Sequence, residues 1–186
     1  DLSFSAEETL TFSGLLSDTE IERSKGYRLG IDSSRFIARR GILRLLLGRY
    51  LQISPGAVNL ITGKHGKPRL SGDHLDKPIE FSVSSSSSMA LFGCSLNQPV
   101  GVDIERVDLD FDYQGVISSY FLDAEQEWLQ SLQPSRRRSA FYLSWVRKEA
   151  YLKGMGIGFS QAAQLPAIPL PEPAYNEAIL LPVKQL

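Results

Sequence analysis

The stretch YLSWVRKEAYLKGMGIG, residues 142–158, limits the fold most strongly, because it has the period of a helix and carries a carboxylate on its apolar side. At about 100° per residue, four apolar side chains fall within about 60° of Glu149. They are Tyr142, Trp145, Val146 and Leu152. Ser144 and Arg147 fall nearly opposite. Such a helix packs against other elements, and it brings Glu149 to the contact.

A carboxylate on a buried face is costly unless it is paired, protonated or bound to a metal. One explanation is an ion pair between Glu149 and Lys153, one turn later, near a helix end. Glycines that can stop the helix follow at Gly154, Gly156 and Gly158. The other explanation is a functional site, and this helix by itself leaves both open.

Composition narrows the class of protein. The chain has 186 residues, 42% of them hydrophobic, which suffices for one sizeable core or for two small halves that share one. A net charge of -1 implies no general attraction to nucleic acid or to an anionic membrane, and no apolar run reaches the about 18 residues of a membrane span. The single cysteine, Cys94, fits a small core residue in a reducing compartment, so we expect a cytoplasmic protein.

Two helices are predicted early in the chain. Asp18–Tyr27 is a short charged helix with Ser17 or Asp18 as its N-cap. Ser33–Leu51 is the strongest helix, with leucines at the i, i+3, i+4 spacing and a cap at Ser33 or Ser34. Five arginines interrupt it, and we expect them to form mostly a solvated face. They are Arg35, Arg39, Arg40, Arg44 and Arg49.

The middle of the chain predicts β-structure. IEFSVSSSSSMALFGCS, residues 79–95, predicts two short strands around a serine-rich turn, and QPVGVDIERV, residues 98–107, predicts another strand. TGKHGKPRLSGD, residues 62–73, predicts a glycine-rich loop.

The rest of the chain mixes helix with irregular structure. DAEQEWLQSL, residues 123–132, and SRRRSAFYLSWVRKEAYLKG, residues 135–154, predict helices. The proline-rich tail predicts irregular chain with an edge strand at EAILLPV. The fold class is therefore α+β, in two halves at residues 1–98 and 99–186.

The stretch VGVDIERV alternates, so Asp103 and Glu105 share one face of the predicted strand. A solvent-facing acidic edge explains them equally well. Together with Glu149, however, these carboxylates repel one another unless a cation lies between them. Oxygen ligands suit a hard ion such as Mg²⁺, which often also binds substrate phosphate. Arg35 and Lys67 are candidates for holding that phosphate.

Four motifs in this order resemble the Sfp-type 4′-phosphopantetheinyl transferases. They are GKPRL, FSVSSSSSMALFG, VGVDIERV and WVRKEAYLKGMGIGF, and the resemblance covers about residues 16–159. The resemblance implies two similar α+β halves related by a pseudo-twofold, with coenzyme A in the cleft between them, in a monomer. It also implies transfer of the phosphopantetheine arm to a serine of an apo acyl or peptidyl carrier protein, with release of adenosine 3′,5′-bisphosphate.

The resemblance assigns site residues in both halves. Asp103, Glu105 and Glu149 match the Mg²⁺ ligands of the family. The positions that match its contacts to coenzyme A are Arg23, Arg35, Lys67, Ser84 and Ser85. Attack of a serine hydroxyl on phosphorus needs a base and help for the leaving phosphate. We expect Glu149 to be the base, directly or through water, and Lys153 to hold and protonate the leaving group.

One motif departs from the family. Where the family has F-N-x-S-H-S this chain has FSVSSS, so Ser82 replaces an asparagine and Ser85 replaces a histidine that contacts a coenzyme A phosphate. Serine donates a hydrogen bond but carries no positive charge. A weakly active or inactive relative that binds coenzyme A or a carrier protein is therefore one alternative. An acidic-cluster Mg²⁺ nuclease is another, against which the absence of a basic stripe argues.

Overall fold

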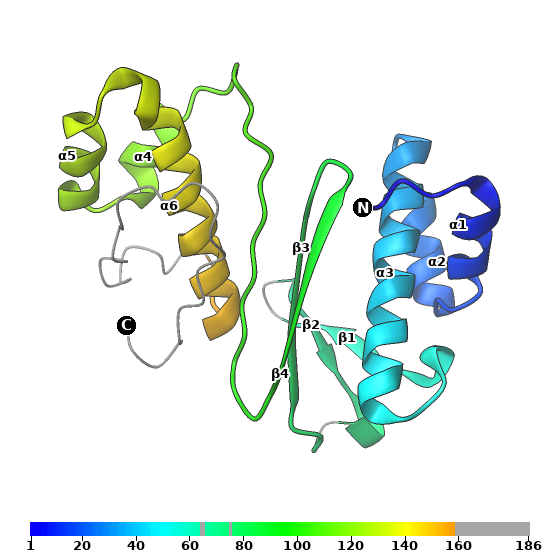
Figure 1. Cartoon of the computed structure of the whole chain (residues 1–186). Coiled ribbons are helices and arrows are strands. Elements are labelled where there is room, and N and C mark those ends of the chain that lie inside the picture. The colour runs from blue at the N-terminus through cyan, green and yellow to red at the C-terminus, as the bar shows by residue number, and fades with distance from the viewer. Residues whose placement is uncertain (64–65, 75, 159–186) are drawn as a thin grey trace.

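The computed structural model describes residues 1–63, 66–74 and 76–158, and within them helices flank two small antiparallel hairpins (Figure 1). The helix α3 (Gly30–Leu51) carries α1 (Ala6–Ser13) and α2 (Asp18–Lys25) on one side and faces the hairpins on the other. Beyond the hairpins an extended segment separates them from α6 (Pro134–Met155), against which α4 (Gln114–Tyr120) and α5 (Asp123–Ser131) lie. The chain is thus α+β, as predicted.

Local signals set the starts of the first two helices. Ser5 and Ser17 each cap a helix in a capping box, in which a glutamate three residues on closes the reciprocal bond. The predicted α2 and its cap at Ser17 are confirmed, whereas α1 and α4 were not predicted. The cap predicted at Ser33 or Ser34 is wrong, because α3 begins after Leu29 and Ser33 Oγ instead donates to the Ser24 carbonyl at 2.8 Å.

The first hydrophobic core lies between α3 and the hairpins. Its buried members are Leu43, Leu47, Val58, Leu70 and Phe81. Cys94 packs against this cluster, as expected of a small core residue, and burial raises the pKa of its thiol. This core fixes β3 (Ile79–Ser86) and β4 (Met89–Leu96) against α3.

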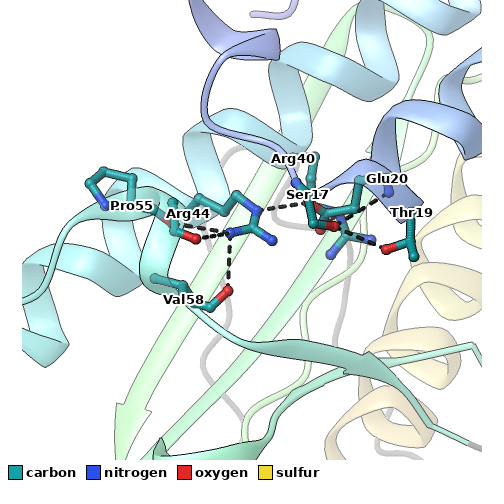
Figure 2. Close-up of polar contacts among 8 residues, drawn as sticks. Ser17, Thr19, Glu20, Arg40, Arg44, Pro55 and Val58 are labelled. Atoms are coloured by element: carbon teal, nitrogen blue, oxygen red, sulfur yellow. Dashed lines mark hydrogen bonds and ion pairs between the residues drawn. The ribbon is translucent and has the colours of Figure 1, made fainter.

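The expectation that the arginines of α3 are mostly solvated is wrong. Glu20 of α2 accepts from Arg44 Nε at 2.8 Å and lies 3.2 Å from Arg40 Nε (Figure 2). Arg44 also donates to the carbonyls of Pro55 and Val58, and its side chain is 3% exposed. A buried guanidinium needs a counter-charge and several acceptors, and these come from elements that helical periodicity does not relate.

The serine-rich hairpin is confirmed. In its antiparallel register Ser82 pairs with Gly93 and Ser86 pairs with Met89, and the two-residue turn includes Ser87 with a φ of 55°. A second hairpin pairs β1 (Leu60–Thr62) with β2 (Pro68–Leu70), and β2 and the last residue of β1 lie in the stretch predicted to be a loop. The short 3₁₀ turns η1 (Pro55–Ala57) and η2 (Gly72–His74) flank it.

The strand predicted at residues 98–107 is wrong, since this segment is extended but joins no sheet. Serine side chains of β3 accept hydrogen bonds from its backbone N–H groups instead. Val102 N–H donates to Ser82 Oγ at 3.2 Å, and Arg106 N–H donates to Ser86 Oγ at 3.0 Å. The alternation expected of a strand is nevertheless retained, because Gly101 faces α6 and Val102 faces the hairpin at Gly93.

Gly101 allows the extended segment to touch the backbone of α6. A Cβ on Gly101 would lie 1.8 Å from the Ala150 carbonyl oxygen and 2.3 Å from the Gly154 nitrogen. Neither backbone atom can rotate away, so any side chain here separates the segment from α6.

We therefore expect Gly101→Ala to lower the free energy of unfolding by about 1–3 kcal/mol, measured by urea denaturation. Gly115→Ala in α4 is the matched control, because a Cβ there meets nothing within 4 Å. It should leave stability unchanged or raise it. Equal stability of the two variants would contradict the close packing at Gly101.

The second hydrophobic core is aromatic and joins α4, α5 and α6. Its buried members are Ile117, Phe121, Leu129, Ala140, Phe141 and Tyr142. Within it Phe141 stacks on Tyr113 with ring centroids 4.7 Å apart. Ser144 and Arg147, opposite the predicted apolar face, are buried too, so α6 is covered on more than one side.

An ion pair is buried between α5 and α6. Lys148 Nζ lies 2.7 Å from Glu125 Oε2, with side chains 1% and 3% exposed. The same carboxylate oxygen accepts from the Leu122 N–H and so caps α5. Removing one partner of a buried pair strands the other charge in an apolar setting.

Lys148→Met is expected to lower the free energy of unfolding by about 3–5 kcal/mol, measured by urea denaturation. The double variant Lys148→Met/Glu125→Gln should recover most of the loss, since the amide oxygen still accepts from Leu122 and no unpaired charge is left. A double variant no more stable than Lys148→Met would show that the pair is not the source of the loss.

No helix in the described ranges is long and apolar enough to cross a membrane. The predicted tail strand at EAILLPV lies outside the described residues.

Candidate active site

The site is built where β3, the extended segment and α6 meet. Ser84 Oγ of β3 donates to Asp103 Oδ1 at 2.6 Å, and Lys153 Nζ of α6 lies 2.5 Å from the same oxygen. Lys153 also donates to Ser84 Oγ at 3.0 Å. Three residues from three elements thus form one closed polar cluster.

Asp103 is the buried centre of this cluster. Its side chain is 2% exposed, whereas that of Lys153 is 29% exposed. The second carboxylate oxygen, Oδ2, is buried and has no hydrogen-bond partner among the described residues. An unpartnered anionic oxygen is costly to bury, and here it is the feature that most needs a ligand.

Glu149 stands beside the cluster on α6. Burial is the largest cause that raises the pKa of its carboxyl; Lys153 lowers that pKa, and the charges of Asp103 and Glu105 raise it further. Within the described residues Lys153 forms its ion pair with Asp103, not with Glu149. A simple ion pair within the helix therefore does not explain Glu149, because Lys153 contacts Asp103 and acts on Glu149 only through its charge.

Glu105 follows Asp103 on the extended segment and is exposed. Ser86 Oγ donates to its Oε2 at 2.8 Å. Of the three predicted metal ligands, Asp103 and Glu105 lie close enough to Glu149 for their charges to raise its pKa. Across residues 1–63, 66–74 and 76–158, however, no three or more His, Cys, Asp or Glu side chains are arranged to hold a metal ion. Lys153 is the cation next to Asp103, and the metal ligands stay a prediction.

Alternation along β3 divides the predicted serines. Ser82, Ser84 and Ser86 face the extended segment, whereas Ser85 faces α3 and accepts a hydrogen bond from Arg39 Nη1. The structure therefore brings Ser84 to the acidic site and places Ser85 on the opposite face of the strand.

The remaining predicted contacts lie at two places. Lys67 Nζ donates to the carbonyls of Val100 at 3.2 Å and Lys153 at 2.7 Å, so it joins the extended segment to the end of α6. Burial lowers its pKa. Arg23 and Arg35 lie on the α3 side, where Arg35 is 3.9 Å from Asp32.

A cavity of about 550 Å³ opens beside the acidic site. Its polar wall includes Ser86, Glu105 and Arg106, and its apolar wall is formed by aromatic side chains. These are Phe111, Phe141, Tyr142 and Trp145. A pocket of this size is typical of a small-molecule site.

Sequence reasoning missed Arg39, which contacts Ser85 directly. The available signal was its position one helical turn after Arg35, which places both on one face of α3. The pairing itself joins residues 46 positions apart in sequence.

An α+β fold with a buried aspartate, a lysine and two further carboxylates beside a serine-rich strand defines a protein with a charged site where three elements meet. Residues 99–182 match the model of the 4′-phosphopantetheinyl transferase superfamily, and the chain belongs to this superfamily.

Individual relatives bear the same name. The 4′-phosphopantetheinyl transferase HetI of Nostoc sp. is 33% identical over 81% of this chain and 63% of its own length. A putative 4′-phosphopantetheinyl transferase of Synechocystis sp. is 34% identical over 80% and 60%. Sfp of Bacillus subtilis is 25% identical over 86% and 69%. The chain thus spans about three fifths of the first two relatives.

Proposed function

We propose that this chain transfers the 4′-phosphopantetheine group of coenzyme A to a serine of an apo acyl or peptidyl carrier protein. The observation that carries the proposal is the cluster of Ser84, Asp103 and Lys153, with a buried unpartnered Asp103 oxygen and Glu149 beside it. The names of the relatives support the same reaction.

The carboxylates present suit a Mg²⁺ ion by their chemistry, although within the described ranges they are not already arranged around one point. Asp103 Oδ2 is free to take a ligand, and the pKa of Glu149 responds to the charges of Asp103 and Glu105. Asp103, Glu105 and Glu149 would hold the ion, which when bound neutralises pyrophosphate charge.

The chain's own groups account for the proton movements. The serine oxygen of the carrier protein forms a bond to the phosphorus that bears the pantetheine arm, and Glu149 accepts the hydroxyl proton. The bond from that phosphorus to the bridging oxygen breaks, and adenosine 3′,5′-bisphosphate leaves. Lys153, partly exposed beside Ser84, holds the charge that develops on the leaving phosphate and donates a proton to it.

The rest of the proposal concerns binding. Arg23, Arg35, Lys67, Ser84 and Ser85 contact coenzyme A, which occupies a cleft between two halves related by a pseudo-twofold. The pantetheine arm fits the cavity between Glu105 and the aromatic wall. The protein is proposed to be cytoplasmic and to act as a monomer.

The direct test is mass spectrometry of candidate apo carrier proteins after incubation with this chain, coenzyme A and Mg²⁺. A gain of one phosphopantetheine on the acceptor serine is expected, and a carrier with that serine changed to alanine is the control. No gain across acyl and peptidyl carriers, with coenzyme A still bound, would favour the alternative of a binding protein that does not transfer. The serine at position 85 is the observation behind this alternative.

A further inference from the structure

A side chain of α6 holds the far end of the extended segment. Arg138 Nη1 donates to the carbonyls of Asp108 and Phe111, each at 2.8 Å, so that one nitrogen binds two acceptors three residues apart. The segment bends at the two residues between them. The guanidinium carbon also lies 5.0 Å from the centre of the Tyr113 ring, on which it stacks.

Tyr142, one turn later on α6, holds the same place. Its hydroxyl accepts from the Asp108 N–H at 3.0 Å and donates to the Asp108 carbonyl at 3.4 Å. Residues four apart on a helix lie on one face, so Arg138 and Tyr142 act together on Asp108. We refer to these two side chains as the clamp.

The stretch that the clamp holds has no strand partner among the described residues. Serine side chains of β3 hold the earlier part of the segment, as far as the Arg106 N–H. From Asp108 onward the clamp joins the segment to α6 instead. A segment without ladder hydrogen bonds keeps its position through such side-chain contacts.

The clamped stretch forms part of the wall of the cavity of about 550 Å³. Asp108 and Phe111 line this cavity, and Phe111 belongs to the extended segment, whereas the other three aromatic rings of the lining belong to α6. Phe111 is 41% exposed, so burial alone does not fix its ring. The hydrogen bond from Arg138 to its carbonyl does so.

The same cavity begins at the acidic site. Glu105 and Ser86 line it, and Glu105 lies two residues after Asp103. A group attached to a phosphate at Lys153 can therefore extend along the cavity to the clamped stretch. The pantetheine arm carries amide groups, a dimethyl group and no charge, which suits a cavity with polar and aromatic walls.

We propose that Arg138 and Tyr142 are positioning residues for the pantetheine arm, because they hold the wall that this arm contacts. The inference rests on the proposed function, which places the arm in this cavity. The hydrogen bonds of both residues end on Asp108 and Phe111, and not on the cluster of Ser84, Asp103 and Lys153. The clamp therefore determines affinity for the arm and leaves binding of the nucleotide unchanged.

The test compares two ligands by calorimetry with Mg²⁺ and without a carrier protein. They are coenzyme A and adenosine 3′,5′-bisphosphate, which has the nucleotide but no arm. Wild type should bind coenzyme A more tightly. Arg138→Gln should weaken coenzyme A about tenfold, since the aromatic wall is no longer held, while affinity for the nucleotide stays within about twofold.

The matched control is Arg136→Gln, which removes the same charge from an exposed position on the same helix. It should bind both ligands as wild type does. Arg138→Lys should recover part of the loss of Arg138→Gln, because an ammonium can still donate to both carbonyls. No recovery would contradict the hydrogen bonds as the cause of the loss.

A second variant leaves the arginine in place. Tyr142→Phe removes the hydroxyl that meets Asp108 and keeps the ring that lines the cavity. It should weaken coenzyme A about threefold and leave the nucleotide within about twofold. If Arg138→Gln does not fold, as its melting temperature would show, Tyr142→Phe decides the matter.

The outcomes separate two failures. Wild type that binds neither ligand refutes the proposed function. Wild type that binds both equally, or an Arg138→Gln variant that weakens both equally or neither, refutes the role of the clamp and leaves the function standing.

Discussion

Replacing Glu149 by glutamine is expected to lower the turnover of phosphopantetheine transfer by about 10²–10⁴-fold, the range that a general base contributes. Glutamine keeps the size of the side chain and cannot accept the serine proton. The rate is measured by mass spectrometry of a carrier protein over time at saturating coenzyme A. Glu127→Gln, an exposed glutamate on α5, is the control and should leave the rate unchanged.

The same Glu149→Gln substitution should leave the free energy of unfolding unchanged or raise it, although it lowers turnover. Because the pKa of Glu149 is raised in the fold, chiefly by burial, its ionised form is less favourable there than in the unfolded chain. Above both pKa values the ionised carboxylate therefore lowers the free energy of unfolding, and this cost disappears below the ordinary value of 4.5. Without Mg²⁺, Glu149→Gln should melt at or above the wild-type temperature at pH 8, with no difference near about pH 4.

A glutamine variant that turns over at a normal rate and loses about 0.3–0.5 kcal/mol of stability would restore the explanation of a simple helix pair with Lys153.

Asp103→Asn is expected to reduce transfer by about 10²–10³-fold, because it removes the buried negative charge around which Ser84 and Lys153 are arranged. Asparagine is isosteric and still accepts from both groups. The loss of activity should therefore exceed what the fall in the free energy of unfolding explains, which is about 1.5–3 kcal/mol for hydrogen bonds to a charged group. Rates and urea denaturation of the same preparation check this.

The dependence on metal gives the sharper readout for Asp103. If this carboxylate takes part in holding Mg²⁺, Asp103→Asn should need a higher Mg²⁺ concentration for half-maximal rate. Asp73→Asn, an exposed aspartate in η2, should not. Near-normal turnover of Asp103→Asn at limiting Mg²⁺ would exclude the metal assignment.

The sequence predicted those parts of the fold that depend on neighbours along the chain. The helices α3, α5 and α6 follow from apolar spacing, α2 follows from its capping residue Ser17, and the β3–β4 hairpin follows from two apolar runs around serines. Motif order likewise indicated the superfamily, because a few residues at fixed spacing define it.

Other features depended on partners distant in sequence. The segment at residues 98–107 has the alternation of a strand, yet it joins no sheet because Ser82 and Ser86 of β3 bind its N–H groups with side chains. Whether a segment with the alternation of a strand forms backbone hydrogen bonds to a sheet therefore depends on the groups that the neighbouring strand offers it.

The charged pairs show the same division. Helical spacing suggested Lys153 as the partner of Glu149, but the fold gives Lys153 to Asp103, 50 positions away in sequence. Arg44 and Arg39 appeared to belong to a solvated face, whereas packing of α2 and β3 against α3 brings Glu20 to the first and Ser85 to the second. The sequence by itself determines which residue types are present and with what local period they recur. The choice of partner for a buried charge is made only when packing removes water and leaves the nearest opposite group to replace it.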